Sequence, residues 1–208
     1  MTAQRARPAR RAALALAMAL AMALAACGGG AAGPPAEGPE AGRPLSAPRS
    51  VPLFSYEAVG GQEISPATLA GRVSVIGFIT TYDAASQAQA RILAELQREH
   101  TPRLNVAVLA LEPPANAPLV EIFAQSLRLP YPVALADAPT IAGEGPFAGL
   151  HHVPSVVILD RRGREVHRRV GLAPRAALEE IIREVERVDA SGAEPALADP
   201  APGSPANP

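Results

Sequence analysis

The chain has 208 residues and 48% of them are hydrophobic, which suffices for one ordinary domain with additional segments at its ends. All 19 basic residues are arginines, there are 20 acidic residues, and the formal net charge is -1. Because the chain lacks a basic excess, we expect no nucleic-acid partner. Its single cysteine, Cys27, excludes an internal disulfide and a multi-cysteine metal site, and we expect no metal and no cofactor.

The first 26 residues have the pattern of a secretory signal peptide. Four arginines near the start precede an apolar run, Ala12 to Ala23, which is too short to span a bilayer permanently. The run ends in Leu24-Ala25-Ala26-Cys27, which resembles the bacterial lipobox, a signal that is cut before an acylated cysteine. We therefore predict a signal peptide at 1–26, lipidation of Cys27, and an exported protein that this anchor holds on the periplasmic face of the inner or outer membrane.

Composition divides the remainder of the chain into three parts. Residues 27–50 are rich in Gly, Pro and Ala and have little to bury, so we expect a disordered linker after the lipidated cysteine. The folded domain is expected at 51–188. The final stretch, 189–208, contains five prolines and is expected to be a disordered tail.

The first half of the domain is organised around a buried strand. A first edge strand is expected at 51–58, followed by a turn at Gly60-Gly61 and a short helical turn at 65–69. The apolar, β-branched run at 73–79 predicts a central strand covered on both faces. Asp83 then has the position of an N-cap, and a helix is expected from Ala84 to His100.

The second half continues the alternation of strands and helices. The patterns predict a strand at 104–111, a helix from Asn116 to about 128, a strand at 131–135, a hairpin at 156–159 and 164–170, and a last helix that opens at Pro174. This order predicts an α/β fold, in which a mixed central β-sheet is flanked by helices.

Two motifs resemble the thioredoxin-like proteins, in particular the membrane-attached thiol-disulfide reductases of the TlpA/ResA type. That group has an apolar strand, then Phe-Trp-Ala-Thr-Trp and a Cys-x-x-Cys pair that opens the helix. Phe78, Thr81 and Tyr82 match the Phe, the Thr and the second Trp, and Ile79 replaces the first Trp. Asp83 and Ser86 fall on the two cysteine positions, so the redox motif of the family is lost.

The second motif is Val-Pro before a strand that ends in apolar-Asp-x-x-Gly. The stretch from Val153-Pro154 to Gly163 follows this pattern, and the resemblance covers about 51–188. It implies a thioredoxin-like fold, a cis peptide bond before Pro154 and a position for that proline beside the helix start at Asp83. It also implies a partner-binding groove, for which the residues are Thr81, Tyr82, Asp83, Val153 and Pro154.

The residues at the former cysteine positions cannot perform disulfide exchange. The reaction needs a thiolate and a second, resolving thiol, whereas Asp83 offers a carboxylate and Ser86 a hydroxyl. We therefore predict no catalytic residue in the chain. Asp83 has a simple structural explanation as a helix cap, and the alternative is a polar recognition surface with Tyr82 and Thr81.

Other candidate sites are weaker. His151 and His152 could approach Asp83 and hold a divalent metal, but adjacent residues in a strand point to opposite faces, so solvated loop histidines are favoured. Ser86 has no identifiable base, which leaves hydrolysis unsupported. Five arginines surround one hairpin and could contact lipid headgroups or an acidic partner, although acidic residues lie among them: Arg161, Arg162, Arg164, Arg168 and Arg169.

The sequence thus predicts a lipid-anchored, exported thioredoxin-like domain that is not an enzyme and binds an envelope protein or peptide as an accessory factor. The alternative is a thiol-disulfide oxidoreductase or peroxiredoxin-like envelope protein that acts with the cysteines of a partner. A third interpretation is a structural envelope protein whose groove has no ligand.

Overall fold

The computed structural model describes residues 44–191 except Pro52, together with their side chains except at positions 44 and 46. The predicted signal peptide, the lipidated Cys27, most of the predicted linker and most of the predicted tail lie outside the described residues. All described residues belong to the second of two units of the chain, Pro39–Pro208.

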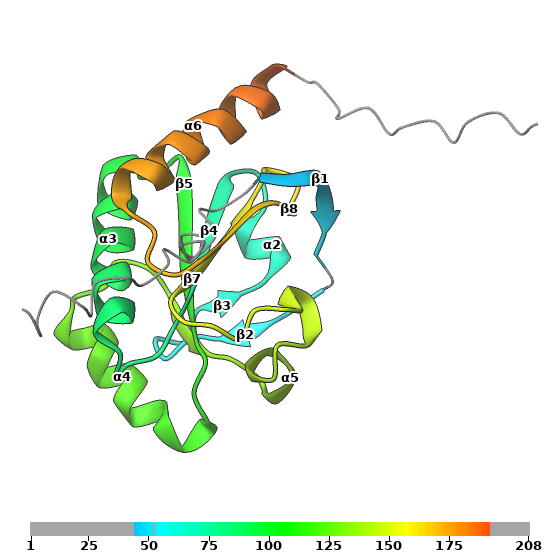
Figure 1. Cartoon of the computed structure of the whole chain (residues 1–208). Coiled ribbons are helices and arrows are strands. Elements are labelled where there is room, and N and C mark those ends of the chain that lie inside the picture. The colour runs from blue at the N-terminus through cyan, green and yellow to red at the C-terminus, as the bar shows by residue number, and fades with distance from the viewer. Residues whose placement is uncertain (1–43, 52, 192–208) are drawn as a thin grey trace, which may run out of the picture. The chain divides into compact units, whose positions relative to one another are not determined.

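A mixed sheet of six strands forms the centre of this unit (Figure 1). The strand order is β1-β8-β7-β4-β5-β6, in which β4, β5 and β6 are mutually parallel and the pairs β4–β7, β7–β8 and β8–β1 are antiparallel. The bounds are β1 Pro44–Ser50, β4 Val73–Ile79, β5 Leu104–Ala110, β6 Val133–Leu135, β7 Ser155–Leu159 and β8 Arg164–Val170.

The sequence VSVIGFI of β4 forms the central strand because it can be buried on both sides. All seven residues are buried, and successive side chains point to opposite faces of the sheet. Val73, Val75 and Ile79 join one hydrophobic core, and Ile76 and Phe78 join the other. This confirms the predicted central strand, and with the flanking layers it confirms the predicted mixed α/β fold.

Helices cover both faces of the sheet. On one face lie three long helices whose buried residues share a core with β4 and β5, and these are α3 Ala84–His100, α4 Ala117–Ser126 and α6 Arg175–Ser191. On the other face lie the small sheet and the short helices, namely β2 Tyr56–Glu57, β3 Glu63–Ile64, α2 Pro66–Leu69 and α5 Ala138–Ile141. Two short 3-10 turns, η1 Pro114–Asn116 and η2 Gly145–Phe147, complete the fold.

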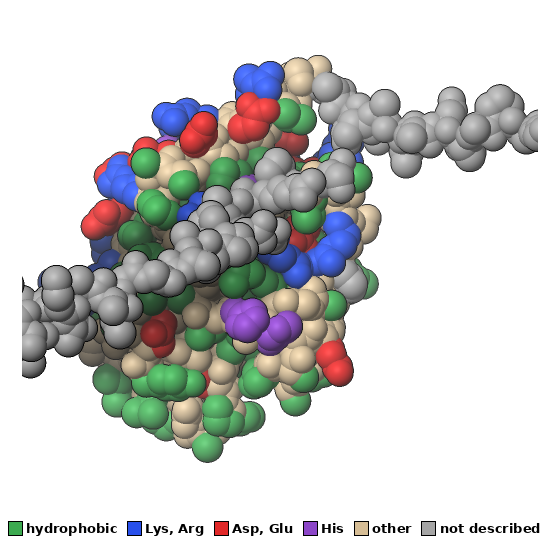
Figure 2. All heavy atoms as spheres, in the orientation of Figure 1, with side chains coloured by type: hydrophobic (Ala, Val, Ile, Leu, Met, Phe, Trp, Pro, Cys, Tyr) green, Lys and Arg blue, Asp and Glu red, His purple; other side chains and the backbone are tan. Residues whose placement is uncertain are grey.

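The charged faces of the helices meet in one cluster of ion pairs. Arg175, at the start of α6, binds Glu179 in its own helix at 2.8 Å and Glu95 of α3 at 3.6 Å, and it also binds Glu99 of α3. Figure 2 shows acidic and basic side chains alternating along the outer face of α6. Because these groups are exposed, they position α6 against α3 more than they stabilise the fold.

The structure corrects the expected start of the domain. Residues 44–50, expected to belong to a disordered linker that ends at 50, form the edge strand β1. Its pairing with β8 is supported by Arg49, whose guanidinium donates to Glu165 at 2.5 Å, and this partner is remote in sequence. The expected edge strand at 51–58 is reduced to β2, which pairs with β3 outside the main sheet.

Candidate functional site

The loop between β4 and α3 uses Asp83 and Ser86 for internal hydrogen bonds. The Asp83 carboxylate accepts the N–H of Ser86 at 2.7 Å, which is the bond of an N-cap. The Ser86 hydroxyl is fully buried and accepts the N–H of Thr80 at 3.2 Å. The two residues therefore close the helix start onto the end of the strand.

The electrostatics of Asp83 follow from this geometry. Hydrogen bonds from the hydroxyl of Ser86, and then from the backbone N–H groups at Ser86 and Ala85, lower the pKa of the Asp83 carboxyl. The positive end of the α3 dipole favours the same charged form. Asp83 is thus a stable anion at neutral pH and is unsuited to act as a general acid.

A buried carboxylate that the sequence analysis missed fixes the same loop. Glu112 is 1% exposed, and its carboxylate accepts the N–H of Thr81 at 2.5 Å and the amide of Asn116 at 2.8 Å. Gln87 in turn donates to the carbonyl of Thr81 at 3.0 Å. An acidic residue directly after a buried strand was the available signal, but nothing in the sequence places it beside Thr81.

The antiparallel register between β4 and β7 brings the second motif to the same end of the sheet. Phe78 faces Ser155, so Thr80 and Thr81 follow β4 where Val153 and Pro154 precede β7. The Val153–Pro154 bond is cis, as the resemblance implied. The structure therefore gathers the two predicted motifs, and we call Thr81, Tyr82, Asp83, Val153 and Pro154 the Tyr82–Pro154 face.

This face offers an aromatic side chain and free backbone groups. Tyr82 is 77% exposed, while Pro154 is buried and its carbonyl accepts the N–H of Gly171 at 2.8 Å. The N–H and carbonyl of the half-buried Val153 make no hydrogen bond with any described residue. None of the five residues lines the cavities of about 850 and 500 Å³ that lie elsewhere in the domain.

The two adjacent histidines differ from their expected arrangement. The rings of His151 and His152 lie side by side, with centroids 4.5 Å apart, and both side chains are exposed; Figure 2 shows such a histidine pair at the surface. The expectation of opposite faces is wrong because this segment is a bend and not a strand. Across residues 44–191 no three His, Cys, Asp or Glu side chains are grouped closely enough to hold a metal ion.

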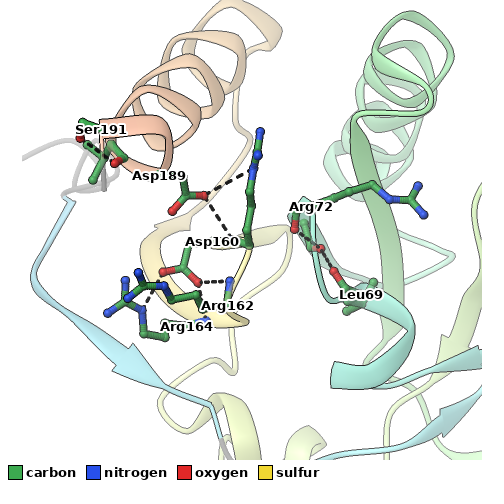
Figure 3. Close-up of polar contacts among 10 residues, drawn as sticks. Leu69, Arg72, Asp160, Arg162, Arg164, Asp189 and Ser191 are labelled. Atoms are coloured by element: carbon green, nitrogen blue, oxygen red, sulfur yellow. Dashed lines mark hydrogen bonds and ion pairs between the residues drawn. The ribbon is translucent and has the colours of Figure 1, made fainter. Parts of the chain in front are cut away.

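The arginine hairpin is paired with acidic residues to a large extent (Figure 3). The Asp160 carboxylate accepts from the N–H of Arg162 at 2.9 Å and from the side chain of Arg164 at 2.7 Å. Arg168 binds Glu165 at 2.6 Å, and Asp189 at the end of α6 accepts the backbone N–H of Arg161. These pairs weaken the interpretation of the hairpin as an open anionic-partner site.

Comparison with solved structures identifies this arrangement. A DsbF homologue from Corynebacterium diphtheriae superposes with a TM-score of 0.61 at 15% identity, over 73% of this chain and 96% of that one. The fold is thioredoxin-like. A secreted thiol-disulfide isomerase from Corynebacterium glutamicum gives the thioredoxin-like domain a TM-score of 0.60 at 16% identity, over 74% and 95% of the two chains.

A third solved structure extends the comparison. A thiol:disulfide interchange protein of the thioredoxin family from Chlorobium tepidum TLS has a TM-score of 0.59 at 22% identity and covers 67% of this chain and 97% of its own. No family model and no curated protein matches the sequence. The thioredoxin-like domain therefore spans nearly the whole of these structural neighbours, whose names describe thiol-disulfide proteins.

The described part of the thioredoxin-like domain contains no cysteine, because Cys27 lies before it. Every helix among residues 44–191 is too short or too polar to span a membrane. The Tyr82–Pro154 face consequently combines an aromatic side chain, an anion and unpaired backbone groups, and it has no thiol of its own.

We expect the replacement of Asp83 by Ala to lower the free energy of unfolding by about 1 kcal/mol at pH 7, the cost of a lost N-cap. Asp83→Ser should lower the free energy of unfolding by less, because the serine hydroxyl can still accept the N–H of Ser86. Urea denaturation of the wild type and both variants measures these differences.

The same substitution should depend on pH in a defined direction. Because folding lowers the pKa of Asp83, its contribution to stability is present above the unfolded-state pKa of about 3.9 and disappears as the pH falls through the folded-state value. The difference between wild type and Asp83→Ala should therefore shrink in acid below pH ~4. A difference that grows in acid would contradict the assignment of Asp83 as a charged cap.

Proposed function

We propose that the chain is an exported, lipid-anchored thioredoxin-like domain that binds a polypeptide on the Tyr82–Pro154 face and performs no redox chemistry of its own. The observation that carries the proposal is the use of Asp83 and Ser86. Both side chains are occupied in closing the β4–α3 loop, while Tyr82 and the backbone of Val153 beside them remain open.

The absence of sulfur from the face argues against exchange chemistry. Disulfide exchange proceeds by attack of a thiolate, and resolution needs a second thiol. Ser86 is fully buried and cannot serve as a nucleophile without movement of the helix start. Cys27, the only thiol in the sequence, is the residue for which we propose acylation.

The open backbone at Val153 argues for an extended ligand. An unpaired N–H and carbonyl beside a sheet can accept a peptide that adds main-chain hydrogen bonds, as in other β-augmentation sites. The bond from Gly171 to the Pro154 carbonyl and the contacts of Glu112 with the Thr81 loop hold the two sides of the face in place. Such a preformed surface lowers the ordering cost of binding.

A redox role with a partner is the second candidate, and the structural neighbours favour it over the non-redox function. Their names describe thiol-disulfide isomerases and interchange proteins. In that case the domain would present a cysteine-bearing partner to a third protein, because the described residues supply neither attacking nor resolving thiol. The chain would then act as a positioning subunit in a disulfide pathway.

Export and anchoring rest on the sequence and on one neighbour. The basic segment, the apolar run and Leu24-Ala25-Ala26-Cys27 occur in the order of a lipoprotein signal. One solved neighbour is named as a secreted protein. We propose that acylated Cys27 holds the domain on the periplasmic face of a membrane, where an envelope protein or peptide is its partner.

Restoring the cysteine pair tests whether only sulfur is missing. The full chain carrying Asp83→Cys and Ser86→Cys should gain thiol-dependent reduction of a protein disulfide such as that of insulin, while the wild type and Asp83→Ser/Ser86→Ala remain at background. Turbidity of reduced insulin gives the rate. Insulin reduction by the wild type above background, at the same rate as by the Asp83→Cys/Ser86→Cys variant, would contradict the proposal.

Photocrosslinking in cells tests the binding face. A benzoylphenylalanine at Tyr82 should capture one defined envelope protein, because the side chain at this position of the Tyr82–Pro154 face is 77% exposed. The matched control places the same group at Leu53, which is 90% exposed elsewhere in the domain.

Two outcomes separate the candidates. Capture that disappears with Val153→Asp, of a partner that binds equally well without its cysteines, supports the non-redox function, whereas dependence on those cysteines supports the redox alternative. An identical pattern from both positions, or no capture, would leave the face without a ligand and favour a structural envelope protein.

Metabolic labelling tests the anchor. Cells given an alkyne-bearing palmitate analogue should incorporate label into the wild-type chain and none into Cys27→Ser. Label that persists in Cys27→Ser would exclude lipidation at this residue.

A further inference from the structure

A cavity of about 850 Å³ lies between α6 and the part of the sheet formed by β8 and β1, and no residue of the Tyr82–Pro154 face lines it. This volume falls within the range of about 300–1,000 Å³ that small-molecule sites occupy. Its apolar wall combines side chains of all three elements: Leu45, Val166, Ala177, Ile181, Val185 and Val188.

Two buried polar atoms in the wall of this cavity have no partner. These are Nε2 of His167, whose side chain is 4% exposed, and Nε of Arg169, and neither forms a hydrogen bond within the described part of the chain. Buried polar groups are nearly always paired in native proteins, so two orphans in one cavity call for a ligand that satisfies them.

The register of β8 places both atoms on the same side of the sheet. His167 faces Ile158 and Arg169 faces Val156, and these two partners belong to the core beneath α6. Burial, followed by the neighbouring charge of Arg169, lowers the pKa of His167, so its ring is neutral at pH 7. A neutral imidazole still carries one N–H to donate, and the Arg169 Nε–H needs an acceptor.

The charged residues that line the cavity balance in number, with four arginines and four carboxylates, and most of them are paired. Arg164 is paired with Asp160, Arg187 with Glu184, and Asp189 with Arg161, which does not line the cavity; Figure 3 shows Asp160 beside Arg164, and Asp189 at the end of α6. The lining residues that make no ion pair with any described residue are Arg169, Arg183 and Glu180. Arg169 therefore has no carboxylate partner among the described residues, and its buried Nε–H needs an acceptor, which favours an anionic group beside it.

We propose that this cavity binds an amphiphile with an unbranched hydrocarbon chain and a carboxylate head, that is, a long-chain fatty acid. The carboxylate accepts from Arg169 Nε–H and from the His167 ring, which satisfies both orphaned groups. The chain lies along Val166, Ile181 and Val185, where its methylenes leave water. No part of this proposal depends on the function of the Tyr82–Pro154 face.

Calorimetric titration tests the proposal on the full chain carrying Cys27→Ser, purified without detergent. The probes are dodecanoate, decanoate and dodecylamine, all below their micellar concentrations. Dodecanoate should bind at one site per chain, decanoate should bind about fourfold more weakly for each methylene removed, and dodecylamine should bind at least tenfold more weakly than dodecanoate.

Variants locate the site. Arg169→Leu and His167→Phe should each weaken dodecanoate binding at least tenfold, while the matched control Arg103→Leu, an exposed arginine outside the cavity, should leave it unchanged. Ala177→Phe fills the cavity from α6 and should abolish binding even if the other variants fold poorly. Equal affinity for dodecylamine, or unchanged binding in Ala177→Phe, would overturn the proposal.

Discussion

The burial of β4 on both faces is the constraint on which the rest of the domain depends. A strand whose seven residues are all buried needs a layer on each side and a neighbouring strand along each edge. Gly77 at its middle lets α3 approach closely, because a Cβ there would lie 2.7 Å from Leu93 and 3.2 Å from Val108. The start of α3, and with it the position of Asp83, is thereby fixed relative to the sheet.

The polar groups at the end of β4 explain how the domain keeps a thioredoxin-like shape without the cysteine pair. Asp83 caps the helix, Ser86 fills a buried position and satisfies Thr80, and Glu112 satisfies Thr81 from the next strand. Each bond serves a backbone group that would otherwise be orphaned. The local structure of the helix start consequently needs no sulfur.

The sequence was sufficient to predict the helices and strands whose hydrophobic residues recur at a regular period. It was insufficient where a strand forms only because it pairs with a strand distant in sequence. The β4–α3 unit, the hairpin of β7 and β8, and α6 all follow such periods. Strand β1, PLSAPRS, has neither apolar alternation nor β-branched residues, and it is a strand because β8 offers an unpaired edge and Glu165 binds Arg49. Local pattern cannot report a partner 116 residues away.

The candidate site was predictable in part for the same reason. Two linear motifs identified Tyr82, Asp83, Val153 and Pro154, and the β4–β7 register brought them to one end of the sheet. Glu112 was not predicted because its role depends on a tertiary contact, in which its carboxylate, after the end of β5, accepts the N–H of Thr81 after the end of β4. The unpartnered atoms of His167 and Arg169 were also not predictable, because they depend on how α6 packs over β8 and not on any local pattern.

The cap formed by Asp83 also bears on the chemistry of any cysteine that a partner brings to this face. At a helix N-terminus that has no bound anion, the positive end of the dipole favours the thiolate form of a nearby cysteine. Here that end is already bound to a carboxylate, and a second anion placed nearby is repelled. A thiol brought to this position would therefore stay protonated and be a poor nucleophile.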